Sequence, residues 1–457
     1  MELFNPADRR PVHFMGVGGA GMSALAILAC RRGVIITGCD TDLAGAQDVI
    51  AAGARVELGH SPSHVSGSRA VVVTAAVPDT HPELVAARKA GIPVVPRKEA
   101  LGGLVNGATV VAAAGTHGKT TTTVMATAAL EAAGFRPTGL AGGRVRQWGG
   151  NARLGDSALY VVEADEYDQA FLALQPTVAI VNNVEPDHLE CYGSIEQLEA
   201  AFAEFASRAG TVLVGGDDPG AQRVARQLGQ KVWRFGVAPD ADLRIGAVQQ
   251  DAAGSRAEVT LPDGRRVQLE LRVPGMHNVR NATGALGAVV ALNGSVEQAL
   301  AALADFDGVG RRFDRLGEAG GVALVDDYAH HPSELVATLA AARQAYPERR
   351  LVAVFQPHLY SRTQEHGAAM GQALAAADVV VVADVYGARE TPVPGVSGQL
   401  VSNAAAEAGA EVHFVADRPS LAGVVRGLVH PGDLVLILGA GDITRIGPEL
   451  LAALAVA

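Results

Sequence analysis

Short runs of small apolar residues alternate along the chain with longer stretches rich in Ala and Leu. The runs at 70–74, 111–114 and 379–383 consist almost entirely of Val and Ala. Continuous apolar runs of this length are typical of parallel strands that helices cover on both faces. The pattern therefore predicts an α/β fold in which buried strands alternate with Ala-rich helices.

The alternation divides into three segments, since 457 residues are too many for one ordinary core. We predict three domains, at 1–106, 107–311 and 312–457. The first and third are predicted to be Rossmann-like, and the second to be a mostly parallel sheet built around a phosphate-binding loop. The stretch 240–273 departs from this pattern, because it alternates as β-hairpins do, with a turn at Pro262-Asp-Gly264.

Composition narrows the classes of partner. The net charge of −11 argues against non-specific nucleic-acid binding and against an anionic membrane surface. No apolar run approaches the roughly 18 residues that a spanning helix needs, and the N-terminus lacks the basic and apolar regions of a signal peptide. We expect a soluble cytoplasmic protein that does not insert in a membrane and is a monomer or a homodimer.

The chain has three cysteines, Cys30, Cys39 and Cys191. Their number is odd and their spacing along the sequence does not match a metal-binding motif. We expect a reducing compartment, with all three serving as small packing residues.

The most informative motif follows the apolar run that ends at residue 114. Gly115, Gly118, Lys119 and Thr120 stand in the order of strand, loop and helix start. Glycines let backbone N–H groups surround a polyphosphate, Lys119 adds a positive charge, and Thr120 can place its hydroxyl on a phosphate-bound Mg²⁺. Ala113 stands where the longer form of this motif has Gly, so a tight strand-to-helix turn with a solvated lysine is the alternative.

A second glycine motif follows the first predicted strand. Gly16-x-Gly18-x-x-Gly21 leads into an Ala-rich helix, and the next strand ends at Asp40, 19 positions after Gly21. This spacing is typical of a Rossmann-like nucleotide site, in which the acid accepts a hydrogen bond from a ribose hydroxyl.

Acidic side chains follow two predicted strands of the second segment. One strand ends in Glu163-Ala-Asp-Glu166, and the next leads into the stretch 182–188, which ends with His188. Carboxylates at strand ends beside a phosphate loop are where Mg²⁺ is usually held. The alternative is two solvated strand ends.

Asn278 and Asn281 stand at the start of a later Ala-rich helix. Their position favours helix capping by Asn278 and recognition of a nucleotide base equally.

Polar residues also follow two strands of the third segment, where ligands of open α/β sheets bind. They are Asp326, Asp327, Tyr328, His330 and His331, and then Gln356, His358, Ser361 and Arg362. The adjacent histidines could indicate a transition metal, but no third ligand stands at a suitable spacing.

These motifs occur together and in one order over essentially the whole chain. The strings that carry the resemblance are His13-Phe-Met-Gly-Val-Gly-Gly-Ala-Gly-Met-Ser23, Gly115-Thr-His-Gly-Lys-Thr-Thr-Thr-Thr123, Glu163-Ala-Asp-Glu166, Glu185-Pro-Asp-His-Leu189 with Cys191-Tyr-Gly193, Pro274-Gly-Met-His-Asn278, Arg311-Arg-Phe313, Val325-Asp-Asp-Tyr-Ala-His-His-Pro332, Phe355-Gln-Pro-His358 with Tyr360-Ser-Arg362, and Gly439-Ala-Gly-Asp-Ile443. On these residues the chain resembles the Mur ligase family of peptidoglycan synthesis, and within it the branch that adds L-alanine.

The resemblance implies a three-domain enzyme with ATP and Mg²⁺, two ions in all, as cofactors. The implied substrates are UDP-N-acetylmuramate and L-alanine. The lactoyl carboxylate of the sugar nucleotide would attack the γ-phosphate of ATP, and the amine of L-alanine would then displace phosphate from the acyl phosphate.

The resemblance also assigns roles to individual residues. It implies an ATP site of Gly115, Thr116, His117, Gly118, Lys119, Thr120, Thr121, Asn278, Asn281, Arg312 and Asp327. It implies metal ligands at Thr120, Glu163 and His188, and a UDP-sugar site at Gly18, Gly19, Gly21 and Asp40. It places the amino-acid substrate near Tyr328, His330, His358 and Arg362, and the catalytic groups at Lys119, His188, His358 and Arg362.

Two features depart from the pattern of that branch. Leu359 stands where relatives often carry Arg, and Tyr167 after the first acidic cluster also fits ligases that recycle a murein tripeptide. The recycling ligase is therefore the first alternative. An NAD-dependent oxidoreductase, suggested by Gly16 to Gly21 with Asp40, and a non-catalytic nucleotide-binding module are more distant ones.

Overall fold

The computed structural model describes residues 3–229, 231–388 and 390–455. By its internal contacts the chain forms two compact units. The first comprises 1–246, 258–268 and 280–303, and the second comprises 247–257, 269–279 and 304–457.

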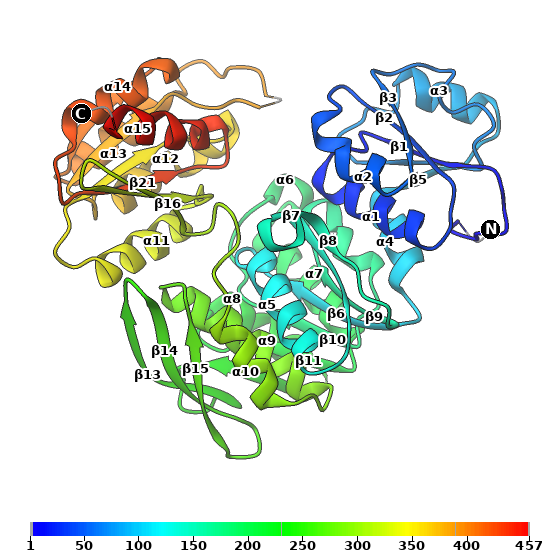
Figure 1. The fold of residues 1–457 in the computed structure, drawn as a ribbon, viewed down its shortest axis with the longest axis horizontal. Helices are drawn as coiled ribbons and strands as arrows, with labels where there is room; N and C mark the ends of the chain where they lie inside the picture. The colour runs from blue at the N-terminus through cyan, green and yellow to red at the C-terminus, as the bar shows by residue number, and fades with distance from the viewer. Residues whose placement is uncertain (1–2, 230, 389, 456–457) are drawn as a thin grey trace. The chain divides into compact units, whose positions relative to one another are not determined.

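The N-terminal part is a five-stranded parallel sheet in the order β3-β2-β1-β4-β5 (Figure 1, blue). Its strands are β1 (Val12–Met15), β2 (Ile36–Asp40), β3 (Arg55–Leu58), β4 (Ala70–Val73) and β5 (Val94–Pro96), and its helices are α1 (Ala20–Arg31), α2 (Gln47–Ala51), α3 (Pro82–Lys89) and α4 (Arg97–Val105). Phe14 and Val72 pack on the side of α1, while Met15 and Val71 pack on the side of α3. Helices therefore cover both faces, as the unbroken apolar strands predicted.

The central sheet has ten strands in the order β15-β14-β13-β12-β11-β10-β6-β9-β7-β8. Its strands are β6 (Thr109–Ala114), β7 (Thr138–Val145), β8 (Gly150–Arg153), β9 (Leu159–Glu163), β10 (Val178–Val181), β11 (Thr211–Gly215), β12 (Val232–Gly236), β13 (Leu243–Asp251), β14 (Gly254–Thr260) and β15 (Arg266–Leu271). The pairs from β13 to β7 are parallel, whereas β7 and β8 are antiparallel. Strand β6 lies between β10 and β9, so the segments that follow these three strands meet at one edge of the sheet.

The helices of the central part connect these strands. They are α5 (Lys119–Ala132), α6 (Leu189–Tyr192), α7 (Ile195–Ser207), α8 (Pro219–Gln227), α9 (Met276–Ala291) and α10 (Val296–Ala304). The side chain of Asp218 caps α8 by accepting from the N–H of Ala221, and it also accepts from the N–H of Val184. A helix cap thus holds the segment that follows β10.

The C-terminal sheet has six strands in the order β16-β17-β21-β18-β19-β20, and only the pair β16–β17 is antiparallel. Its strands are β16 (Asp314–Ala319), β17 (Val322–Asp327), β18 (Leu351–Phe355), β19 (Val379–Ala383), β20 (Glu411–Val415) and β21 (Leu434–Leu438), and its helices are α11 (Pro332–Ala345), α12 (Tyr360–Leu374), α13 (Gly398–Glu407), α14 (Leu421–Leu428) and α15 (Ile446–Ala455). Residues of α11, α12 and α13 pack on one face, and residues of α14 and α15 pack on the other.

The predicted fold class is confirmed, with three α/β parts and a mostly parallel central sheet. The expected hairpins of 240–273 appear as β13, β14 and β15. The strand expected to end at Asp40 is β2, which does end there. The domain boundaries at 106 and 311 stay a prediction.

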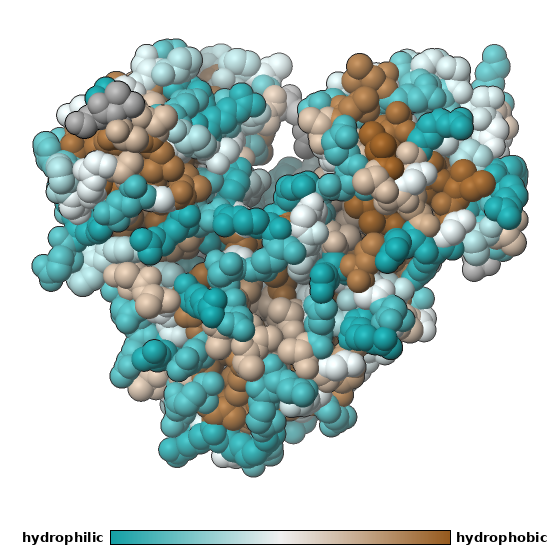
Figure 2. Space-filling view, in the orientation of Figure 1, coloured by the Kyte–Doolittle hydropathy of each residue, from teal (hydrophilic) through white to brown (hydrophobic). Residues whose placement is uncertain are grey.

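Among the described residues, no helix is both long and apolar enough to cross a membrane. Figure 2 shows hydrophobic residues interspersed with hydrophilic ones on the visible face. The large apolar side chains exposed to solvent come from many separate segments; they are Ile35, Ile50, Leu58, Val85, Tyr167, Val237, Val336, Tyr386 and Leu400.

Close backbone packing behind the phosphate loop makes Gly215 a test of the fold. A Cβ atom on Gly215 would lie 2.0 Å from the carbonyl oxygen of Asn182. Because that neighbour is backbone, we expect Gly215→Ala to lower the free energy of unfolding by about 1–3 kcal/mol. Gly103→Ala is the matched control, since Gly103 lies exposed in α4 with nothing within 4 Å of the added atom. Equal thermal midpoints for the two variants would contradict the packing.

Candidate active site

The loop between β6 and α5 has the backbone of a phosphate cradle. Gly115 and Gly118 have φ values of +137° and +80°, which L side chains rarely adopt. Gly118 precedes the first residue of α5, so the N–H groups of the first helical turn point out of the helix toward the loop. A polyphosphate at this end would meet those N–H groups and the positive end of the helix dipole.

Lys119 forms a buried ion pair with Glu166. The Nζ atom lies 2.8 Å from Oε1 of Glu166 and also donates to the carbonyl oxygens of Gly115 and Thr116, at 2.8 and 3.1 Å. The Glu166 side chain is 2% exposed, and its other oxygen is buried without a hydrogen-bond partner. The pair thus keeps the ammonium folded back over the loop.

Burial by itself would lower the pKa of Lys119, but the carboxylates of Glu166, Asp165 and Glu163 outweigh it and raise that pKa above its ordinary value. Burial raises the pKa of Glu166 in spite of the lysine. Lys119 is therefore charged at neutral pH. A buried positive charge beside backbone donors suits an anionic ligand.

Residues that follow β10 brace the loop from behind. The Asn182 side chain donates to Thr122 Oγ1 at 2.9 Å, and the N–H of His117 donates to Asn183 Oδ1 at 2.7 Å. Glu185 N donates to Thr116 Oγ1 at 2.9 Å, and its carboxylate lies 3.3 Å from His117 Nε2. The second acidic stretch therefore serves the loop structurally. His117 and Thr116, expected at ATP, contact this brace.

Thr120 and Glu163 lie at the ends of neighbouring elements of the same edge. Thr120 is buried in the first turn of α5, next to Thr121, and Glu163 is the last residue of β9. The Glu163 carboxylate accepts the N–H of Gly142 at 2.6 Å, and a Cβ on Gly142 would lie 2.6 Å from Glu163 Oε1. Glycine at 142 thus permits the approach that orients this carboxylate.

His188 follows β10 in a left-handed conformation, with φ of +54°, just before α6. Its ring packs edge-on against Tyr167, with the two ring centroids 5.1 Å apart, and its nitrogens lie 3.7 and 3.5 Å from Asp187 and Glu190. Among the described residues, Glu163 and His188 belong to none of the groups of at least three His, Cys, Asp or Glu whose ligand atoms lie together. The structure therefore does not bring the predicted metal ligands into one protein cage.

The two asparagines of α9 make different contacts. A Cβ on Gly118 would lie 2.6 Å from Asn281 Oδ1, so Asn281 reaches the phosphate loop. Asn278 lies inside the first turn, because α9 begins at Met276, and its amide donates to the Pro274 carbonyl at 2.7 Å. The capping alternative for Asn278 is thus wrong, because an N-cap side chain accepts a backbone N–H of the first turn, whereas the Asn278 amide donates to a carbonyl.

The glycine loop of the N-terminal part is closed by Asp40. The N–H of Gly18 donates to Asp40 Oδ2 at 2.8 Å, and a Cβ on Gly18 would lie 3.0 Å from that oxygen. Gly19 precedes α1, and a Cβ on Gly21 would lie 2.6 Å from Arg97 Nη1. Asp40, the residue expected at a ribose, therefore holds the loop.

A pocket of the first unit joins the glycine loop to the end of β9. Its lining residues are Gly21, Ala24, Leu25, Arg97, Leu101, Leu140, Ala141, Gly142, Val162, Glu163 and Asp165. Arg97 lies 3.4 Å from Asp165 within it. The pocket places one guanidinium and two carboxylates between the two predicted ligand sites of this unit.

In the second unit Asp327 anchors the residues 311–313. Its oxygens accept the N–H groups of Phe313 and Ala329, at 2.7 and 2.8 Å. Arg311 and Phe313 have φ values of +59° and +51°, so these bonds hold a backbone that is otherwise disfavoured. Burial raises the pKa of Asp327 to about 6, although Arg312 and the two N–H groups oppose it. Asp327 thus positions Arg312.

Four predicted substrate residues come together in the same unit. The ring of Tyr328 packs 5.2 Å from His330, whose ring lies 6.2 Å from that of His358. Burial lowers the pKa of both histidines to about 4, with Arg362 contributing to each shift. At neutral pH the cluster therefore has two neutral imidazoles beside a guanidinium. The ring of His331 packs against His366 instead, with the two ring centroids 5.1 Å apart.

Sequence patterns missed several members of these sites. Glu166, Asn182 and Asn183 stood in the acidic strings, but nothing in the spacing paired them with the loop. Gly142 and Arg97 gave no signal, because each acts through contact with a distant segment.

Three family descriptions match the chain in order. They are "Mur ligase family, catalytic domain" at residues 11–109, "Mur ligase middle domain" at 113–289, and "Mur ligase, glutamate ligase domain" at 311–441.

The chain belongs to the Mur ligase family.

Curated relatives match this Mur ligase over nearly its full length. The UDP-N-acetylmuramate–L-alanine ligase of Streptomyces griseus is 44% identical, covering 98% of this chain and 97% of its own. The ligase of the same name from Kineococcus radiotolerans is 45% identical, with 97% and 96% covered.

Solved structures agree with the fold. The UDP-N-acetylmuramate–alanine ligase of Thermotoga maritima has a TM-score of 0.83 at 28% identity, covering 97% of this chain and 98% of its own. A murein peptide ligase from Psychrobacter arcticus has a TM-score of 0.72 at 25% identity, covering 98% and 99%.

The buried pair of this Mur ligase can be tested with Glu166→Gln. The variant leaves the Lys119 charge without its partner, so we expect the free energy of unfolding to fall by about 3–5 kcal/mol. Glu131→Gln is the control, because Glu131 pairs with Arg153 at the surface, where such pairs are worth about 0–1 kcal/mol. Denaturation is followed by tryptophan fluorescence, since Trp148 and Trp233 both lie in the first unit.

ATP supplies the second half of this test. A triphosphate would replace the missing negative charge, so ATP with Mg²⁺ should raise the midpoint of Glu166→Gln more than that of the wild type. Equal shifts would contradict a phosphate site at Lys119.

The pKa of Asp327 predicts a pH dependence. The folded protein protonates this carboxyl below about 6, whereas the ordinary value is 3.8. The folded state thus binds the extra proton between these values, and the contribution of Asp327 to stability is lost as pH rises from about 4 through 6. We expect the wild type to lose stability relative to Asp327→Asn over this range in calorimetry. Parallel profiles would contradict a raised pKa.

Proposed function

We propose that this Mur ligase joins L-alanine to the lactoyl carboxylate of UDP-N-acetylmuramate, with ATP converted to ADP and phosphate. The observation that carries the proposal is the phosphate loop, held by residues that follow β10 and by the Lys119–Glu166 pair, in a chain whose relatives are ligases of that name. The carboxylate attacks the γ-phosphorus and ADP departs. The amine of L-alanine then attacks the acyl carbon, and phosphate departs after the tetrahedral intermediate.

Both steps develop negative charge that fixed donors can stabilise. The ammonium of Lys119 leaves Glu166 for the β- and γ-phosphates, and the N–H groups at the start of α5 bind phosphate oxygens. Asn281, beside Gly118, and Asn278, one turn earlier on α9, face the adenine side. Arg312 and Asp327 serve the phosphate and the ribose, with Asp327 also holding the backbone that presents Arg312.

The donor set fits Mg²⁺ in part. The Thr120 hydroxyl and the Glu163 carboxylate are the hard oxygen ligands that this ion prefers, whereas His188 offers a nitrogen. We assign Thr120 and Glu163 to a first ion and His188 to a second. Bound Mg²⁺ would neutralise phosphate charge and bring the two anionic reactants together.

Gly18, Gly19, Gly21 and Asp40 form the proposed site of the UDP-sugar. We add Arg97, because its guanidinium lies against Gly21 in the pocket that also holds Glu163. A diphosphate between the start of α1 and Arg97 would meet a helix dipole and a full positive charge.

Tyr328, His330, His358 and Arg362 form the proposed amino-acid site. Arg362 binds the carboxylate of L-alanine, as a guanidinium can do with two parallel hydrogen bonds. The neutral rings of His330 and His358 can accept hydrogen bonds from the amino group. Leu359 precedes α12 with a φ of +69°, and its N–H donates to the Tyr386 carbonyl, so its place is set by backbone contacts.

We place the reaction in the cytoplasm, where ATP is made available and where Cys30, Cys39 and Cys191, all free thiols, stay reduced. Whether the protein works as a monomer or a homodimer stays a prediction.

The function is tested by phosphate release from ATP. We expect release only with both UDP-N-acetylmuramate and L-alanine present. Lys119→Ala should lower turnover at least about 100-fold, since a lost transition-state cation is worth several kcal/mol. Lys89→Ala is the control, because Lys89 is an exposed residue at the end of α3.

Three outcomes would change the assignment. Equal turnover with a murein tripeptide in place of L-alanine would favour the recycling ligase. An absorbance change at the nicotinamide band would favour an oxidoreductase, and undiminished turnover in Lys119→Ala would remove the lysine from the chemistry.

A further inference from the structure

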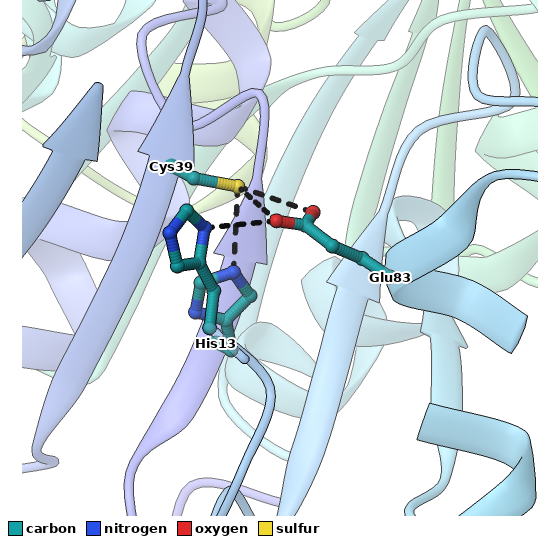
Figure 3. A group of neighbouring side chains, drawn as sticks. His13, Cys39 and Glu83 are labelled. Atoms are coloured by element: carbon teal, nitrogen blue, oxygen red, sulfur yellow. Dashed lines mark hydrogen bonds and ion pairs between the residues drawn. The ribbon is translucent and has the colours of Figure 1, made fainter. Parts of the chain in front are cut away.

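A group of metal-binding side chains lies in the N-terminal part, on the side of the sheet that α3 covers. His13 lies on β1, Cys39 on β2, His64 in the segment after β3, and Glu83 in the first turn of α3. One ligand atom from each lies within 4.8 Å of all the others. Figure 3 shows His13, Cys39 and Glu83 pointing toward one another from these separate elements.

The distances within the group suit ligands of one small ion. The Sγ atom of Cys39 lies 3.4 Å from Nε2 of His13 and 3.3 Å from Oε2 of Glu83. Nδ1 of His64 lies 2.9 Å from Oε1 of Glu83. Four ligands at the bond lengths usual for Zn²⁺, about 2.0–2.3 Å, stand about 3.3–3.8 Å apart in a tetrahedron. The two Cys39 distances fall in this range, whereas His64 and Glu83 lie closer together, at 2.9 Å.

The side chains are held in place and shielded from water. Cys39 and the Glu83 side chain are fully buried, His13 is 1% exposed and the His64 side chain is 10% exposed. His13 Nδ1 contacts Thr37 Oγ1 at 3.0 Å, which leaves Nε2 toward the sulfur. A hydrogen-bonded second nitrogen is the usual companion of a histidine ligand.

The charges of the group also favour a cation. The buried Glu83 carboxylate is bonded by the N–H of Ser61, by the Cys39 thiol and by the imidazoles of His60 and His64, and among the described residues no Lys or Arg pairs with it. Ring nitrogens of His13 and His60 and a carboxylate oxygen of Glu83 all lie within 3.5 Å of the Cys39 sulfur. The thiol has one hydrogen and can donate to only one of these three atoms at a time.

We propose that His13, Cys39, His64 and Glu83 bind one Zn²⁺ ion as a structural site. A thiolate, two imidazoles and a carboxylate are a ligand set for this ion, whereas Mg²⁺ prefers oxygen alone. On binding, the thiol proton leaves to solvent and the sulfur–zinc bond forms. His60 lies beside the site, but its side chain is 28% exposed and we leave it outside the ligand set.

The ion would tie together elements that carry the glycine loop. His13 lies three residues before Gly16, and Cys39 directly precedes Asp40, whose carboxylate holds the N–H of Gly18. With four protein ligands the site has no open position, so it has a structural and not a catalytic role. It shares no residue with the proposed ATP and Mg²⁺ ligands.

The test uses Co²⁺ as a spectroscopic probe of the full-length protein. Chelator-treated protein is titrated with Co²⁺ in excess Mg²⁺, which occupies the oxygen sites. We expect one equivalent to produce thiolate-to-cobalt charge transfer and the intense d–d bands of a four-coordinate ion. One equivalent of Zn²⁺ should then displace Co²⁺ and abolish these bands. Both titrations use the wild-type protein.

Variants identify the ligands. Cys39→Ser should abolish the charge-transfer band, and His64→Ala should weaken Co²⁺ binding at least about 100-fold, more than the loss of a supporting residue. Cys30→Ser is the matched control, because Cys30 lies in α1 outside the group, and it should keep the band. A wild type without the band overturns the proposal and leaves a hydrogen-bonded cluster. A band that survives in Cys39→Ser overturns it as well.

Discussion

The buried ammonium of Lys119 is the group around which the central site is arranged. A charged lysine inside a protein needs a partner, and Glu166 provides it at 2.8 Å from a neighbouring strand end. The same pair keeps the ammonium over the loop, with carbonyl oxygens of Gly115 and Thr116 as further acceptors. An incoming phosphate would exchange one anionic partner for another, so the lysine stays compensated in both states.

Close approach of polar side chains to glycines explains why substitutions at this edge of the sheet would be disruptive. Gly118 and Gly115 lie against Asn281 and Asn182, and Gly142 lies against Glu163. At each contact a side chain larger than hydrogen would push a functional group out of place. The polar residues at the strand ends therefore have two roles. They hold the loops in place, and they also supply the side chains that we propose to bind the ligands.

In the second unit, too, polar residues hold the backbone that presents other functional side chains. Asp327, which we propose to lie at the ribose of ATP, accepts backbone N–H groups with both of its carboxylate oxygens and thereby positions Arg312. His330 and His358 are kept neutral by burial near Arg362. A carboxylate substrate would therefore meet the guanidinium as the dominant positive charge of that cluster.

The sequence by itself determined the α/β class, the succession of strands, the phosphate loop and the polar strand ends, because these features are local and repeat with strand and helix periodicity. Strand β19, for example, spans the apolar run 379–383. Only the tertiary structure decided that Glu166 pairs with Lys119, that Asn281 reaches Gly118, and that Cys39, expected to be a packing residue, lies with His13 and Glu83. These contacts join residues tens of positions apart, and parallel strand order, which sequence spacing does not encode, brings them together.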